Sequence, residues 1–118
     1  MPKTVSWNLQ LQVQEGHADE VRDLMNDMIR ATKEEPGAAG YEWFLSADGK
    51  TCHINERYAD AEALMVHLGN FGSKFAQRFT TCFAPTSFTV YGEPGAEARA
   101  VLDGFGANYL GWLGGFSR

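Results

Sequence analysis

Hydrophobic and polar residues alternate without interruption from Ser6 to Gln14. A repeat of two residues is typical of a β-strand, because successive side chains of a strand point to opposite faces of its sheet. The segment therefore predicts a strand with one apolar face and one polar face. The residues of the apolar face are Trp7, Leu9, Leu11 and Val13.

The spacing of hydrophobic residues changes to three and four after the turn at Glu15-Gly16. This spacing indicates an amphipathic helix that begins at Ala18 and carries acidic residues in its first turn. We expect the helix to end near Glu35, because Pro36 disfavours helical backbone in the residue before it. Its apolar positions are Val21, Leu24, Met25, Met28 and Ile29.

Two extended segments follow, Tyr41 to Ala47 and Thr51 to Tyr58, and the turn-forming pair Asp48-Gly49 lies between them. Together they predict a β-hairpin. A last alternating run, Thr86 to Tyr91, comes directly after Pro85 and predicts the final strand.

Asp60 is a good N-cap for a second helix, because its carboxylate can accept hydrogen bonds from the free backbone N–H groups of the first turn. A 3.6-residue repeat follows, and we expect Gly69 and Gly72 to interrupt or bend it. The apolar positions of this stripe are Ala61, Leu64, Met65, Leu68, Phe71, Phe75 and Phe79.

The predicted elements follow the order βαββαβ, which is the order of the ferredoxin-like α+β fold. In that fold four strands form one antiparallel sheet, and both helices cover the same face of it. The opposite face would be bare, and a bare apolar face is unfavourable in water. A second copy packed on this face would remove the exposed area, so we expect a homodimer.

Residues 93–118 fall outside the predicted core of residues 5–92, within a chain that we interpret as one domain of residues 1–118. The stretch from Ala96 to Leu102 predicts a short helix. The remainder combines glycines with aromatic residues, a composition unlike that of a disordered tail. We expect an ordered arm that packs on the body of the domain or on a partner subunit.

The chain has 118 residues, of which 44% are hydrophobic, and this is enough for one core without disulfides. Ten basic and fifteen acidic residues give a net charge of −5, so we expect no binding to nucleic acid. No apolar run approaches the roughly 18 residues of a membrane span, so we expect a cytoplasmic protein. Cys52 and Cys82 form no CxxC motif, which argues against a thiolate metal site.

His67 lies on the second predicted helix, one turn before Phe71 and close to the apolar stripe. An imidazole titrates near neutral pH, so His67 could take a proton from a phenol or form a hydrogen bond with a substrate oxygen. A histidine at the edge of the core, paired with a backbone group, fits the same position.

Glu56 lies on the strand before this helix. If its face of the strand looks toward the helices, Glu56 could orient His67 through a hydrogen bond. Pairing of Glu56 with Arg57 of the partner subunit or with Arg78 is an equal alternative.

Two histidines and a carboxylate are a familiar ligand set for iron, which makes His53, Glu56 and His67 a group to consider. Residues 53 and 56 point to opposite faces of a regular strand, because they are an odd number of positions apart. We therefore predict no metal site.

Aromatic residues at strand and helix spacing could line a flat pocket for a small aromatic substrate. Packing in an ordinary core is the alternative for each of them. Asn8 lies on the strand face opposite Trp7, where it could bond a substrate oxygen or face solvent or a dimer interface. The predicted substrate-binding residues are Asn8, Trp43, Tyr58, Phe71 and Phe75.

Two segments carry a resemblance to a known family. Residues 56–64, ERYADAEAL, are followed by His67, and the final strand ends in residues 88–92, FTVYG. With these segments the chain from about Val5 to Gly92 resembles the antibiotic biosynthesis monooxygenase (ABM) family, which includes small quinol monooxygenases.

The resemblance implies a dimeric α+β barrel and an oxygenase that uses molecular oxygen without flavin, haem or metal. A deprotonated quinol can itself give an electron to oxygen, so the protein need only bind the ring, favour its ionised form and exclude water. His67 matches the family histidine in position. We expect a cofactor-independent monooxygenase of a quinol or polycyclic phenol, with His67 as base or hydrogen-bond partner and Glu56 orienting it.

The family also contains haem-degrading relatives, whose later helix resembles SxxFxxAH. In this chain the comparable stretch contains Ser73 and Phe75, and Phe79 stands where the haem-ligating histidine would lie. We therefore predict no cofactor. A non-catalytic module of the same fold, which binds a small ligand or acts in a stress response, is the alternative function.

Overall fold

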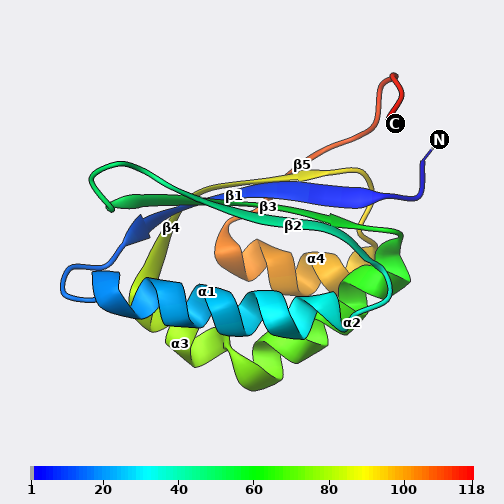
Figure 1. The fold of residues 1–118 in the computed structure, drawn as a ribbon. Helices are drawn as coiled ribbons and strands as arrows, with labels where there is room; N and C mark the ends of the chain where they lie inside the picture. Colours follow the sequence, from blue (N-terminus) through cyan, green and yellow to red (C-terminus); the bar gives the residue numbers. More distant parts are fainter. Residues whose placement is uncertain (1) are drawn as a thin grey trace.

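The computed structural model describes residues 2–118, which form one sheet with helices on one side (Figure 1). The strands are β1 (Val5–Val13), β2 (Ala38–Leu45), β3 (Thr51–Tyr58), β4 (Phe83–Tyr91) and β5 (Asn108–Leu110). Their order across the sheet is β2-β3-β1-β4-β5. The central strand β1 is antiparallel to β3 and to β4, whereas β5 is parallel to β4.

The helices cover a single face of the sheet (Figure 1). They are α1 (Ala18–Lys33), α2 (Ala61–Lys74), α3 (Ala76–Cys82), α4 (Ala96–Leu102) and the 3-10 turn η1 (Asp103–Phe105). The predicted ferredoxin-like α+β fold is confirmed from β1 to β4, with α3 as a continuation of α2. Strand β5 was not predicted, and it makes the sheet mixed where an antiparallel sheet was expected.

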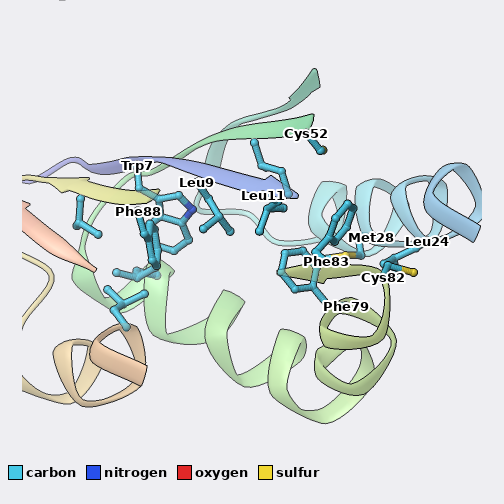
Figure 2. Packing of buried hydrophobic residues seen from close by; sticks show 14 of the residues in the cluster. Trp7, Leu9, Leu11, Leu24, Met28, Cys52, Phe79, Cys82, Phe83 and Phe88 are labelled. Carbon is cyan, nitrogen blue, oxygen red and sulfur yellow. The ribbon is translucent and has the colours of Figure 1, made fainter. Parts of the chain in front are cut away.

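The alternation along β1 is confirmed, because its apolar residues are buried and point toward the helices (Figure 2). Its polar residues form the open face of the sheet. There Asn8 Nδ2 donates to Asn55 Oδ1 at 2.7 Å, and Gln10 Nε2 donates to Asn8 Oδ1 at 2.9 Å. The expectation of an apolar bare face is therefore wrong along the centre of the sheet, since strand alternation places amides there. The homodimer stays a prediction, but an apolar bare face at the centre of the sheet no longer supports it.

The predicted interruption of the second helix is at a different residue. Gly69 and Gly72 lie inside α2, and the helix breaks at Phe75, whose φ is −126°. Glycine weakens a helix by only about 1 kcal/mol relative to alanine, so packing of the apolar stripe can carry a helix through it. The cap at Asp60 is confirmed, because Ala63 N donates to Asp60 Oδ1 at 2.8 Å.

Strand β4 begins before Pro85, although the sequence suggested that it begins after this residue. The register with β1 shifts between Gln10, which faces Ser87, and Leu11, which faces Pro85. On its other side β4 pairs with β5 only from Thr89 onward. Pro85 thus lies at a bulge on an edge, where a strand tolerates a residue without a backbone N–H.

The C-terminal residues divide into two parts. The helix expected from Ala96 to Leu102 is present as α4, and Ala98 and Leu102 are buried in the core. Beyond β5 the chain rises away from the side that carries the helices (Figure 1), and Leu113 and Phe116 are 98% and 83% exposed. No helix within residues 2–118 is both long enough and apolar enough to cross a membrane.

Candidate active site: a buried imidazole between two carboxylates

His67 is buried between the side chains of Glu35 and Glu56, and all three residues are 5–7% exposed. His67 Nδ1 lies 3.0 Å from Glu35 Oε1, and His67 Nε2 lies 3.3 Å from Glu56 Oε1. The three residues come from α2, from the segment between α1 and β2, and from β3. The fold therefore brings together charges that are far apart in the sequence.

This geometry determines the protonation of His67. A neutral imidazole has one N–H donor and one acceptor nitrogen, whereas two carboxylates require a donor on both sides of the ring. Burial by itself lowers the pKa of His67, but the hydrogen bonds with Glu35 and Glu56 raise it to about 9. The imidazole is therefore a cation at neutral pH.

Two neighbours hold the carboxylates in place. The Tyr58 hydroxyl donates to Glu56 Oε1 at 2.6 Å, and Asn70 Nδ2 donates to Glu35 Oε2 at 3.2 Å. Burial, and then the nearby charge of Glu56, raise the pKa of the Tyr58 phenol well above its ordinary value, so Tyr58 stays a donor. Its ring also lies beside the imidazole, with 4.9 Å between centroids.

A cavity of about 40 Å³ adjoins this cluster between the sheet and the helices. Glu56 and His67 supply its polar lining, and the rest of the wall is apolar. Glu56 stands beside Trp7 in the register of β1 and β3, so these two side chains reach the cavity as neighbours. The aromatic residues of the wall are Trp7, Phe71, Phe79, Phe88 and Phe105.

Of the residues predicted to form the site, Glu56, His67 and Phe71 line the cavity. Tyr58 does not line the cavity, but it donates a hydrogen bond to Glu56, which does. The structure does not bring the other predicted residues to the cavity. Trp43 packs against Phe83 with ring centroids 5.9 Å apart, Phe75 occupies the break between α2 and α3, and Asn8 lies on the open face of the sheet.

The contacts of Glu56 match its predicted pairing with His67. Its partners are His67 and Tyr58, whereas Arg78 pairs with Asp27 at 3.0 Å. His53 lies on the face of β3 opposite Glu56, as the spacing predicts. Within residues 2–118, no group of three or more His, Cys, Asp and Glu side chains is arranged to hold a metal ion.

One functional residue of the site was missed at the sequence level. Glu35 was considered only as the end of α1, although it provides the second carboxylate of the cluster. Its one sequence signal is a second acidic residue in succession directly before Pro36. The C-terminal segment, which the sequence predicted to pack on the body of the domain or on a partner, contributes Leu102 and Phe105 to the cavity wall.

The fold and the site define a ferredoxin-like α+β protein with an ionic cluster in an aromatic interior. The family model described as antibiotic biosynthesis monooxygenase matches residues 4–78, and the chain belongs to this family. The comparison with curated proteins gives no match.

Solved structures share the fold. MupZ from Pseudomonas fluorescens has a TM-score of 0.86 at 22% identity, over 100% of this chain and 91% of that chain. A variant of SnoaB from Streptomyces nogalater, a cofactor-independent oxygenase, has a TM-score of 0.66 at 12% identity, over 80% and 96%. Rv0793 from Mycobacterium tuberculosis has a TM-score of 0.58 at 26% identity, over 74% and 91%.

Proposed function

We propose that the protein is a cofactor-independent monooxygenase that oxidises a quinol or polycyclic phenol with molecular oxygen. The observation that carries this proposal is the Glu56–His67 pair, whose charged groups line an otherwise apolar, aromatic cavity. Membership of the family supports it, and so does the fold shared with SnoaB, a cofactor-independent oxygenase. Aromatic walls suit a ring substrate, and a buried acceptor suits its hydroxyl group.

In the proposed reaction, Glu56 accepts the proton of the substrate hydroxyl. His67 is the hydrogen-bond partner in this scheme and not the base, because both of its ring nitrogens already face carboxylates. The imidazolium stabilises the negative charge that passes to the substrate and then to oxygen, an effect that is strong in a site without water. Glu35 holds the imidazolium from its other side.

The overall reaction needs no external reductant. When the keto tautomer of a polycyclic phenol presents a ring CH₂ group, oxidation to C=O releases four electrons. Molecular oxygen accepts all four, one oxygen atom enters the product, and the other leaves as water. The protein's share is to bind the ring, remove a proton and exclude solvent.

Oxygen uptake with a panel of hydroquinones tests this proposal. Glu56→Gln should lower turnover by roughly a hundredfold or more, the usual scale for loss of a proton acceptor. Glu62→Gln is the matched control, since Glu62 is exposed on α2 and should leave turnover unchanged. If the parent consumes no oxygen above the protein-free rate with any substrate, the monooxygenase proposal fails and the non-catalytic binding module takes its place.

We also propose that the protein acts as a cytoplasmic homodimer. Exposed apolar side chains on the arm after β5, Trp112, Leu113 and Phe116, support association with a second copy. Cys52 and Cys82 are buried free thiols, which suits a reducing compartment. Burial raises the pKa of the Cys52 thiol to about 11, so this residue stays protonated.

A further inference from the structure

The cavity beside Glu56 is smaller than any ring that the proposed reaction would use. Its volume of about 40 Å³ is close to the roughly 30 Å³ that one water occupies in the liquid, whereas a cavity that binds benzene measures roughly 150 Å³. Part of the wall must therefore move before a ring can reach Glu56.

The wall contains few residues that can move outward. Trp7 and Leu9 belong to the central strand β1, Phe88 belongs to the adjacent strand β4, and all three are buried. Only lining residues that are themselves partly exposed can separate the cavity from solvent. These are Leu68, Phe71 and Phe105.

Phe105 differs from the other two in its backbone. Leu68 and Phe71 lie within α2, a helix of 14 residues. Phe105 is the last residue of the single turn η1, and it lies between Gly104 and Gly106. A Cβ atom at either glycine would meet no atom within 4 Å, and Gly106 has a φ of +77°. Two glycines in open space leave the backbone around Phe105 freer than that of a helix.

The Phe105 ring packs edge-on against Phe71 in the cavity wall, with centroids 5.9 Å apart and planes at 68°. The segments on both sides of Phe105 are anchored. Leu102 is buried before it, and the Tyr109 hydroxyl donates to Asp103 Oδ1 at 2.6 Å after it. An outward movement can therefore be confined to the glycine-flanked turn.

We propose that Phe105 is a specificity-determining residue, which swings outward to admit a ring and sets the largest ring system that fits beside Glu56. The inference rests on the proposed function for the class of ligand, a phenol. The family model matches residues 4–78, and Phe105 lies beyond them. The part of the cavity wall that Phe105 forms is therefore outside the segment that defines the family.

Calorimetric titration under anaerobic conditions tests the inference without turnover. The probes are phenol, 1-naphthol and 9-phenanthrol, with one, two and three fused rings. Phe105→Ala should raise the affinity for 9-phenanthrol relative to phenol by at least tenfold, because it removes the side chain that limits ring size. Phe44→Ala is the matched control, since Phe44 is an exposed phenylalanine on β2 that does not line the cavity.

The inference is overturned if Phe105→Ala leaves the ratio of affinities at the parent value, or if no probe binds to either protein. Phe105→Leu is a second variant in case the alanine variant does not fold. Its ratio of affinities for 9-phenanthrol and phenol should fall between the ratios of the parent and of Phe105→Ala. Ring-size selection by Phe105 without oxygen uptake would refute the monooxygenase proposal and leave the role of Phe105 intact.

Discussion

His67 couples the stability of the fold to pH through its two carboxylate partners. Its pKa rises from 6.5 to about 9 on folding, so the folded chain holds this proton more tightly than the unfolded chain. The contribution to stability is complete below pH 6.5 and is lost as the pH rises through about 9. The shift corresponds to something on the order of 3 kcal/mol.

Urea unfolding at pH 6 and at pH 10 measures this contribution. The free energy of unfolding of the parent should fall between the two pH values by more than that of His67→Gln, which lacks the titrating ring. His17→Gln is the control, because His17 lies near the surface beside Glu20 and should follow the parent. If the free energy of unfolding depends equally on pH in the parent and in His67→Gln, the positive charge assigned to His67 is contradicted.

Glu35 should act as a positioning residue for this imidazolium. Glu35→Gln replaces a carboxylate by a neutral amide 3.0 Å from Nδ1, so the pKa of His67 should fall by about one unit or more. An NMR titration of the imidazole protons measures the change. The neighbouring Glu34, which is exposed, offers Glu34→Gln as a control that should leave the titration where it is.

The two carboxylates also show how far sequence can predict this site. Strand parity places Glu56 on the same face as Ile54 and Tyr58, so its contact with His67 follows once that face is known to look toward the helices. Glu35 lies 32 positions before His67 in an irregular segment, where no repeat indicates the direction of a side chain. Its role depends on how α1 packs against the sheet, and only the structure gives this.

At the scale of secondary-structure elements, the connection between α1 and β2 has no space for a side chain at its glycine, Gly37. A Cβ atom at Gly37 would collide with the Cβ of Ala63 in the first turn of α2. Gly37→Ala should therefore destabilise the protein by roughly 1–3 kcal/mol, and it should displace the nearby Glu35 from His67. Thermal unfolding gives the first effect, and the NMR titration of His67 gives the second.

Gly69 provides the contrasting substitution. A Cβ atom there would meet nothing within 4 Å in the interior of α2, so Gly69→Ala should stabilise the helix by roughly 0.5–1 kcal/mol. The two substitutions are chemically identical and should have opposite signs. Stabilisation by Gly37→Ala would show that the close contact with Ala63 is relieved without loss.

The elements with a clear repeat were predictable, and those that depend on a neighbour were not. The repeats of two and 3.6 locate β1 and α1 because each buries one face against the same core. Strand β5 has three residues, too few for a pattern, and it forms only because β4 offers a free edge from Thr89 to Tyr91. The glycines at positions 69 and 72 predicted a break in the second helix, but the packing of α2 against the core outweighs the low helix propensity of glycine.

At the scale of the whole molecule, we expect two chains of 13.0 kDa to give about 26 kDa by light scattering. Replacing Leu113 and Phe116 together by serine should weaken the dimer, because both side chains are more than four-fifths exposed in the single chain. Val66→Ser is the control, since Val66 is an exposed apolar residue on the helical side. A monomeric parent at micromolar concentration would contradict the dimer.

Strand β5 is held to the sheet by three residue pairs, while β1 is paired on both sides along nearly its whole length. Backbone amides of Asn108–Leu110 should therefore exchange with deuterium through brief local openings, whereas those of β1 should wait for global unfolding. The outer wall at Phe105 directly precedes this weak strand in the chain. Because β5 carries one anchor of the Phe105 turn, its local opening would enlarge the outward movement of Phe105, whereas β1 would keep the inner wall of the cavity in place.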